Sequence, residues 1–183
     1  LDERFGSETA FVDEVVATIA QPVITQLASE GTPFVGLLYA GLILTSKREH
    51  DADNGIRVIE FNARFGDPET QVVLPRLVTP LSQLLFAAAT GTLDAQPRPE
   101  FSDRAAVTVV LASENYPDSP VTGRVLTGVA EANSSEGVHI AHAATAEQDA
   151  QLIATGGRVL NVVAVADSFT EARSRAYAAL HTI

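Results

Sequence analysis

A run of polar side chains between residues 57 and 71 has the composition of a site for metal-assisted chemistry. It opens with apolar β-formers, and side chains at alternate positions of a strand point to the same face. If the strand continues far enough, Glu60, Asn62 and Arg64 form one row. Carboxylate and amide oxygens bind hard cations, and a guanidinium binds phosphate or carboxylate. On spacing alone, the solvated face of an edge strand is an equally good interpretation.

The residues that follow this row have the pattern of a turn leading into a helix. We expect the turn at Gly66-Asp67, with Asp67 as the N-cap and Pro68 in the first helical position. Glu69 then lies in the first turn, where a carboxylate interacts favourably with the helix dipole. The N-terminus of this helix would bind an anion beside the row. Together the row and the helix indicate metal-assisted chemistry on a phosphate or a carboxylate.

A β-hairpin is expected to hold the row. The apolar run Phe34–Leu44 predicts a buried strand, in which Gly41 indicates a bulge or a close backbone approach. The charged segment 46–55 ends in an Asn-Gly pair, which is typical of a hairpin turn. We therefore expect Leu37–Thr45 and Ile56–Asn62 to pair as antiparallel strands.

Helices are expected on both sides of this hairpin. Apolar residues recur at helical spacing between residues 11 and 27, with Ser7 as N-cap and Gly31 at the C-terminal end. Pro22 predicts a kink in this helix. After Pro68, a short helix is interrupted at Pro75, and a further helix stops at residue 91.

The segment 94–103, with two prolines and four charged residues, is the expected domain boundary. We expect one domain over residues 1–96 and a second, β-rich domain over 103–183. The second domain carries several Val-rich or short apolar runs. They predict strands at Ala105–Ala112, Gly123–Val129, Val138–His142, Gln151–Ala154 and Arg158–Val165. Gly156-Gly157 is expected to form a hairpin turn, and Ser168 to cap a final helix.

The composition excludes several classes of protein. A net charge of −11 argues against nucleic acid or an anionic membrane as a main partner. The absence of cysteine excludes disulfides, thiolate catalysis and zinc–thiolate sites. No apolar run reaches the length of a membrane span, and the first residues lack a signal-peptide pattern. The chain starts at Leu1 and has no methionine, so we expect an upstream portion to be missing. The alternative is a small, complete, processed protein.

The histidines are not expected to form a site. His139 and His142 lie on one expected strand at an odd separation, which places them on opposite faces. Ordinary surface roles are the better interpretation of both.

The motif from Glu60 to Gln71, EFNARFGDPETQ, resembles the phosphoribosylamine–glycine ligase family of the ATP-grasp superfamily. The run Leu38–Leu42 and the later Gly156–Leu160 also resemble this family, so the likeness covers nearly the whole chain. It implies an α+β fold: the C-terminal half of an ATP-grasp domain, an antiparallel sheet with helices, followed by a small β-rich domain with one helix.

The resemblance also implies an activity and roles for the residues of the motif. Glu60 and Asn62 match the magnesium ligands of the ATP-grasp site, and Arg64 matches an arginine near the acyl phosphate. The reaction implied joins glycine to 5-phosphoribosylamine through glycyl phosphate, using ATP and Mg²⁺ or Mn²⁺, in cytoplasmic purine biosynthesis. Asp67 and Glu69 are weaker candidates for binding either amine, because a cap and a dipole partner explain them equally well.

The chain lacks two features of ATP-grasp enzymes: a nucleotide-binding half and a second acidic metal ligand. It has no Gly-rich phosphate loop, so adenine and most triphosphate contacts are expected in a missing N-terminal half. At the position where several ATP-grasp enzymes have a second acidic ligand, this chain has Tyr39, as this ligase family does. We therefore expect two protein ligands and negligible activity of the piece alone. Two alternatives stay open: another ATP-grasp ligase or carboxylase, and a non-catalytic fragment that docks to the missing half.

Overall fold

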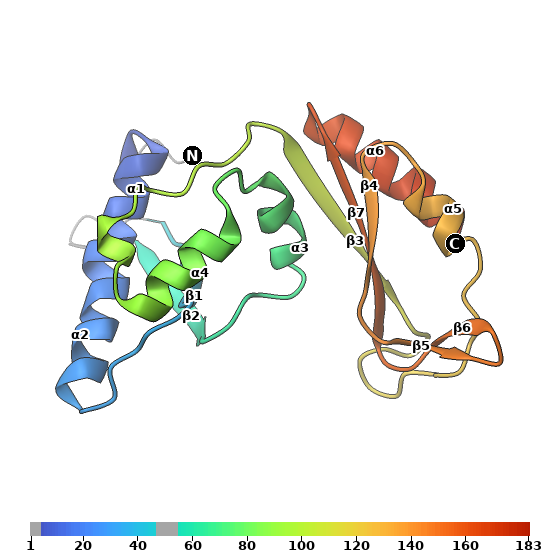
Figure 1. Cartoon of the computed structure of the whole chain (residues 1–183), viewed down its shortest axis with the longest axis horizontal. Helices are drawn as coiled ribbons and strands as arrows, with labels where there is room; N and C mark the ends of the chain where they lie inside the picture. Colours follow the sequence, from blue (N-terminus) through green and yellow to red (C-terminus); the bar gives the residue numbers. More distant parts are fainter. Residues whose placement is uncertain (1–4, 47–54) are drawn as a thin grey trace. The chain divides into compact units, whose positions relative to one another are not determined.

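The computed structural model describes residues 5–46 and 55–183, which form two compact units. Of the described residues, the first unit comprises 5–46, 55–66 and 84–96, and the second comprises 67–83 and 97–183. The predicted mixture of helices and antiparallel strands is confirmed (Figure 1). The predicted domains, residues 1–96 and 103–183, stay a prediction. No helix in the described ranges is long and apolar enough to cross a membrane.

The first unit begins with a helical segment whose irregularity lies next to the proline. Helix α1 (Glu8–Val15) passes through a π-helical turn (Val16–Ala20) into α2 (Gln21–Ser29). Ser7 caps α1 as predicted, since its Oγ accepts a hydrogen bond from the Ala10 N–H at 3.1 Å. Pro22 has no N–H to donate to the preceding helical turn, so the regular hydrogen-bond ladder is interrupted at this position. The predicted kink therefore takes the form of a π turn just before the proline.

A two-stranded antiparallel hairpin follows in the same unit. Strand β1 (Tyr39–Leu44) pairs with β2 (Ile56–Asn62), as predicted. Strand β1 starts later than expected, because Gly36 takes a φ of +152° that breaks the extended run. Residue 54 of the predicted turn lies outside the described residues.

Short helices connect this hairpin to the rest of the chain. They are α3 (Thr70–Val73), the 3₁₀ turn η3 (Leu74–Arg76), α4 (Leu81–Thr90) and the 3₁₀ turn η4 (Leu93–Ala95). The interruption at Pro75 and the end of α4 before Gly91 agree with the prediction. Gly91 has a φ of +69°, the left-handed conformation typical of a helix C-terminus.

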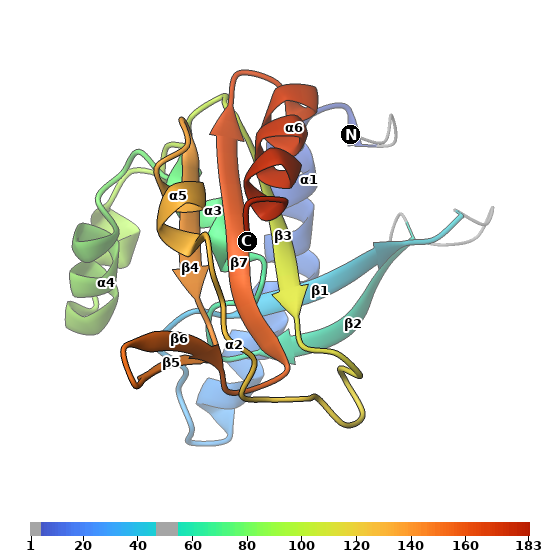
Figure 2. The same ribbon diagram turned by 90° about the vertical axis from the view of Figure 1, so that its right-hand side faces the viewer.

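The second unit is built on a three-stranded antiparallel sheet in the order β3-β7-β4. Its strands are β3 (Ala105–Ala112), β4 (Val138–His142) and β7 (Arg158–Ala166). A separate hairpin joins β5 (Thr145–Gln148) to β6 (Gln151–Ala154). Helices α5 (Val129–Asn133) and α6 (Phe169–Leu180) cover one face of the sheet, as Figure 2 shows. Helix α3 packs on the other face, against β3 and β7.

The core of this unit lies between the sheet and its two helices. Leu160, Val162 and Ala164 on the central strand are completely buried and belong to one cluster with Ala176 and Ala179 of α6. The alanines bring the α6 backbone close to the sheet, which keeps the layer thin and densely packed. The central strand β7 therefore supplies the largest share of the buried side chains in this core.

The structure corrects three expectations for this unit. Residues 123–129 do not form a strand, because Gly128 adopts a left-handed φ of +72° and α5 starts directly after it. Residues 103–183 therefore carry two helices, α5 and α6, instead of one. Gly156-Gly157 is not a hairpin turn, since β6 pairs with β5 while β7 pairs with β3 and β4. The tight turn lies instead at Asp149 and Ala150, both with positive φ.

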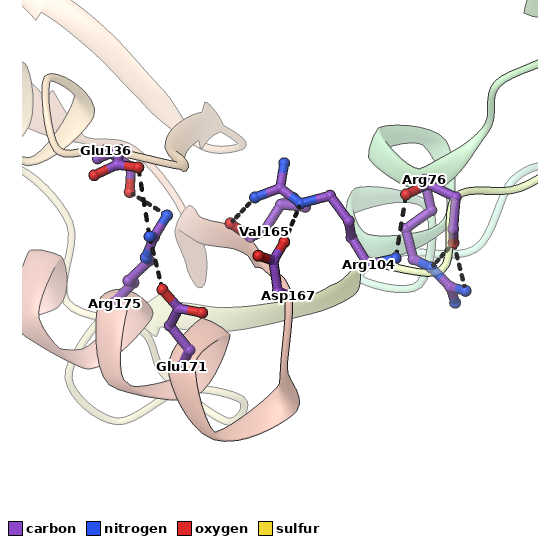
Figure 3. Close-up of polar contacts among 8 residues, drawn as sticks. Arg76, Arg104, Glu136, Val165, Asp167, Glu171 and Arg175 are labelled. Carbon is purple, nitrogen blue, oxygen red and sulfur yellow. Dashed lines mark hydrogen bonds and ion pairs between the residues drawn. The ribbon is translucent and has the colours of Figure 1, made fainter.

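Arginines connect segments of the second unit that lie far apart in the sequence (Figure 3). Arg76 donates from Nε and Nη2 to the Ser102 carbonyl, at 3.2 and 3.0 Å. Arg175 lies between Glu171 at 2.8 Å and Glu136 at 3.5 Å. The Arg76 contacts help explain why residues 67–83 group with the later part of the chain.

Candidate metal and substrate site

The last residues of β2 bring a carboxylate and an amide together. Glu60 lies opposite Gly41 and Asn62 opposite Tyr39 in the hairpin. The Asn62 side chain donates from Nδ2 to Oε1 of Glu60 at 3.1 Å. The two predicted ligands therefore lie side by side, with Glu60 exposed and Asn62 half-buried.

Gly41 makes room for the Glu60 side chain. A Cβ atom on residue 41 would lie 3.1 Å from Cγ of Glu60, closer than side chains usually pack. The strand register also shifts between Gly41 and Leu42. A glycine and a bulge beside Glu60 together explain the close approach that the sequence predicted.

Arg64 does not continue the row. Strand β2 ends at Asn62, so the alternation that would align Arg64 with the other two side chains stops there. Arg64 lies in a bend and donates from Nη1 to the carbonyl of the adjacent Phe65 at 3.0 Å. The structure thus groups Glu60 with Asn62 and leaves Arg64 on a separate, exposed segment.

The predicted helix start at Asp67 is wrong. Residues 67–69 form a turn with a cis Asp67-Pro68 peptide, and α3 begins only at Thr70. Glu69 occupies the N-cap position without a side-chain cap hydrogen bond. Asp67 does not cap because its Oδ1 accepts from Gln71 Nε2 at 3.0 Å. A helix of four residues also has too small a dipole to attract an anion.

Arg158, at the start of β7, contacts this turn; it lies in the run Gly156–Leu160 that carries the family resemblance, but the sequence analysis gave it no role. It donates from Nη1 to the Asp67 carbonyl at 2.8 Å, and the same nitrogen lies 3.7 Å from Oδ2 of Asp67. Its Nε donates to the Tyr116 hydroxyl at 2.9 Å. That hydrogen bond and the field of Tyr116 raise the pKa of Arg158, with smaller contributions from Asp67 and Glu69. The signal in the sequence was the Gly-Gly pair before Arg158, which was interpreted as a turn.

A pocket of about 490 Å³ lies in the second unit. His139 and His142 both line it, together with Asn133 and apolar residues of α5, β4 and β6. His142 is the last residue of β4, and its Nδ1 lies 2.9 Å from Thr145 Oγ1. Both histidines are exposed, and their orientation on opposite faces of the strand stays a prediction.

Glu60 and Asn62 offer two oxygen ligands, so a hard cation bound to them needs further ligands to complete its coordination shell. Oε2 of Glu60 and Oδ1 of Asn62 accept no hydrogen bond from any residue that the structure describes, so both oxygens are available to a cation. Residues 5–46 and 55–183 contain no group of three or more acidic, histidine or cysteine side chains arranged to hold a metal. Two neighbouring oxygens fit Mg²⁺ when phosphate and water oxygens fill its other positions.

Comparison with known proteins places both halves of the chain in one enzyme family. The family description "Phosphoribosylglycinamide synthetase, ATP-grasp (A) domain" matches residues 6–70, and "Phosphoribosylglycinamide synthetase, C domain" matches residues 106–183. Residues 60–70 of the motif thus fall in the ATP-grasp match, and Arg158 falls in the C-domain match.

Individual relatives carry the same name and are much longer than this chain. The phosphoribosylamine–glycine ligase of Leifsonia xyli is 65% identical over 175 residues, which are 94% of this chain and 40% of the relative. The ligase of Streptomyces coelicolor is 52% identical over 97% of this chain and 41% of the relative. The crystal structure of the Thermotoga maritima ligase matches with a TM-score of 0.68 and 32% identity, over 85% of this chain and 36% of that one. The chain spans about 40% of the curated relatives named here.

Proposed function

The chain belongs to the phosphoribosylglycinamide synthetase family, and on that basis we propose that it is the C-terminal part of an ATP-dependent ligase. The ligase joins glycine to 5-phosphoribosylamine and forms glycinamide ribonucleotide, ADP and phosphate. This reaction is a step of purine biosynthesis, which we assign to the cytoplasm. Use of ATP follows from the ATP-grasp family, whereas the two amine substrates and the metal are part of the proposal.

The proposed chemistry proceeds in two steps. The glycine carboxylate attacks the γ-phosphorus of ATP, which gives glycyl phosphate and releases ADP. The amine of phosphoribosylamine then attacks the glycyl carbonyl carbon, so the C–N bond forms as phosphate leaves and the amine loses a proton. Bound Mg²⁺ or Mn²⁺ would neutralise charge on the phosphates during the first step.

The residues of this chain have distinct parts in that proposal. Glu60 and Asn62 would hold the metal through Oε2 and Oδ1, the two oxygens that accept no hydrogen bond from the described residues. Arg64 would stabilise the negative charge of the acyl phosphate, which its exposed position at the end of β2 allows. Asp67 and Glu69 would bind the ammonium group of glycine or the amine of phosphoribosylamine. The contact between Glu60 and Asn62 is the observation that carries the proposal.

We propose that the rest of the ligase supplies the adenine site and covers apolar surface of the first unit. Several large apolar side chains of that unit are exposed, including Val12, Val16, Ile43, Ile59 and Phe61. An exposed apolar surface of this kind is typical of a segment that packs against further protein. The chain alone is therefore expected to be inactive, and mixing it with the upstream half is expected to restore ligation.

The metal role can be tested in the intact ligase with Glu60→Gln and Asn62→Ala. Asn62→Ala removes one proposed metal ligand, and Glu60→Gln removes the negative charge of the other with almost no change in shape. We expect glycine-dependent ADP formation to fall about a hundredfold and to require more Mg²⁺, since metal ligands contribute strongly to phosphoryl transfer. Glu147→Gln is the matched control, because Glu147 is an exposed glutamate on β5 outside the proposed site. Wild-type turnover in the Glu60 and Asn62 variants would overturn the proposed function.

A further inference from the structure

We propose that Arg158 is a positioning residue of this ligase: it holds the Asp67 turn in place from the first residue of the central strand β7. The inference rests on the proposed function, in which Asp67 and Glu69 bind the amine substrates. It adds a role for the strand β7, whose residues were assigned no part in the reaction.

The guanidinium of Arg158 connects two loops at once. One nitrogen, Nη1, contacts both the carbonyl and the carboxylate of Asp67, at 2.8 and 3.7 Å. Another nitrogen, Nε, donates to the Tyr116 hydroxyl at 2.9 Å. An arginine suits this place because its planar group carries several donors in a fixed arrangement. A lysine has one charged nitrogen and cannot reproduce both contacts in the same geometry.

Hydrogen bonds also fix the loop of Tyr116, the second partner of Arg158, to the segment that precedes the arginine. Ser113 donates from its backbone N–H to the Gly157 carbonyl at 2.8 Å and from Oγ to the Gly156 carbonyl at 2.7 Å. The Tyr116 N–H donates to the Ser113 carbonyl at 3.2 Å. The loop that carries Tyr116 is thus fixed to the segment just before Arg158, so the guanidinium has a rigid support.

The contacts made by Arg158 hold both the backbone and the carboxylate of Asp67, which is one of the two residues proposed to bind the amine substrates. Asp67 also accepts a hydrogen bond from Gln71 at 3.0 Å, so its carboxylate has a partner on α3 as well as on β7. The Asp67 carbonyl, held by Arg158, fixes the backbone two residues before Glu69. Small displacements of substrate-binding groups have large kinetic effects. Loss of Arg158 should therefore lower kcat/KM for the amine substrates and leave the KM for ATP unchanged.

The competing explanation is an ordinary surface ion pair, which contributes little to stability or function. Arg104 provides the matched case within the same unit (Figure 3). Its Nε lies 3.3 Å from Oδ1 of Asp167, and its Nη2 donates to the Val165 carbonyl at 3.3 Å. The side chains of Arg104 and Arg158 are 48% and 41% exposed. Each arginine thus contacts one carboxylate and one backbone carbonyl, but only Arg158 contacts the motif.

The test compares Arg158→Met with Arg104→Met in the intact ligase. Hydrogen exchange measured by mass spectrometry reports the mobility of residues 66–71, and steady-state kinetics report KM for glycine, phosphoribosylamine and ATP. For Arg158→Met we expect faster exchange in this segment and a loss of kcat/KM for the amine substrates of about tenfold or more. The KM for ATP should not change. Arg104→Met should leave both measurements at wild-type values.

A double-mutant cycle adds a readout that general destabilisation does not move. If Arg158 acts through Asp67, the double variant Arg158→Met/Asp67→Asn should lose less kcat/KM than the product of the fold-losses of the two single variants. Unchanged exchange in residues 66–71, equal losses in the two arginine variants, or independent effects in the cycle would each overturn the inference. A Glu60→Gln variant with wild-type turnover would instead overturn the proposed function, and the exchange result would still report on Arg158.

Discussion

The backbone of Gly157 lies so close to the ring of Tyr116 that a Cβ atom on residue 157 would overlap the ring carbon Cδ2. The glycine and the tyrosine come from segments about forty residues apart, and their contact places the Tyr116 hydroxyl within 2.9 Å of Arg158 Nε. Gly157 therefore serves close packing here, because it does not adopt a positive φ. The pair Gly157 and Tyr116 determines where the arginine can point.

Replacing Gly157 with alanine should destabilise the second unit. The added methyl group forces the Tyr116 ring to move, and overpacking of this kind costs about 1–3 kcal/mol. Thermal unfolding followed by circular dichroism measures the effect. Tyr116→Ala removes the obstructing ring, so Gly157→Ala should cost much less in that background. An equal cost in both backgrounds would show that the ring is not the obstacle.

The contribution of Arg158 to stability should not depend on pH near neutrality. The pKa of Arg158 is raised in the folded protein, chiefly by its hydrogen bond to Tyr116. A raised pKa on a cation means that its stabilising effect is complete below the unfolded-state pKa and is lost only as pH rises through the folded-state pKa. Both values lie far above pH 9. The difference in unfolding free energy between wild type and Arg158→Met, measured by urea denaturation, should therefore be constant from pH 6.5 to 9. A steady change over that range would contradict this assignment.

A methyl group at residue 41 should impair the proposed metal site without unfolding the hairpin. In Gly41→Ala the new Cβ lies 3.1 Å from Cγ of Glu60, so the glutamate side chain must shift by a few tenths of an ångström. We expect the Mg²⁺ concentration for half-maximal activity of the intact ligase to rise about threefold to tenfold, as for other changes beside metal ligands. Ile43→Ala changes an exposed side chain of the same strand and is the control. An unchanged Mg²⁺ requirement in Gly41→Ala would contradict the proposed position of the metal.

Local patterns in the sequence predicted the elements that depend on local chemistry. The antiparallel hairpin, the Ser7 cap and strand β3 follow from β-forming runs, a capping side chain and a continuous apolar segment. Their energetics lie within a few neighbouring residues, so the printed sequence contains the necessary information. The row of Glu60 and Asn62 was predictable for the same reason, because it depends only on strand alternation.

The errors arose where contacts distant in the sequence decide the conformation. Asp67 looked like a helix cap, but its carboxylate accepts a hydrogen bond from Gln71, and Arg158, ninety-one residues away, donates to its carbonyl and forms an ion pair with its carboxylate. Gly156-Gly157 looked like a hairpin turn, but β7 pairs with β3 and β4 instead of β6. The actual turn at Asp149 and Ala150 lacks the glycine that usually marks positive φ. Neither the partner of a strand nor the partner of a carboxylate can be inferred from local spacing.

The central strand offers a prediction about a buried polar group. Asn161 is 1% exposed on β7, and its Oδ1 has no hydrogen-bond partner among the described residues. A buried carbonyl oxygen without a partner is unfavourable, and an apolar side chain of similar size removes that cost. Asn161→Val should therefore be as stable as the wild type or more stable by about 1 kcal/mol, and valine also suits the strand.

Asn161→Asp is the matched contrast, since it keeps the shape but adds an ionisable group. Burial raises the pKa of a carboxyl group, so this variant must either charge a buried site or bind a proton. Its penalty should be small below about pH 4 and should grow as pH rises, to about 3 kcal/mol or more at pH 7. Urea denaturation at pH 4.5 and pH 7 measures both variants against the wild type. A strong loss of stability in Asn161→Val would show that the amide is bonded after all, and an Asn161→Asp variant unaffected by pH would show that residue 161 is reached by water.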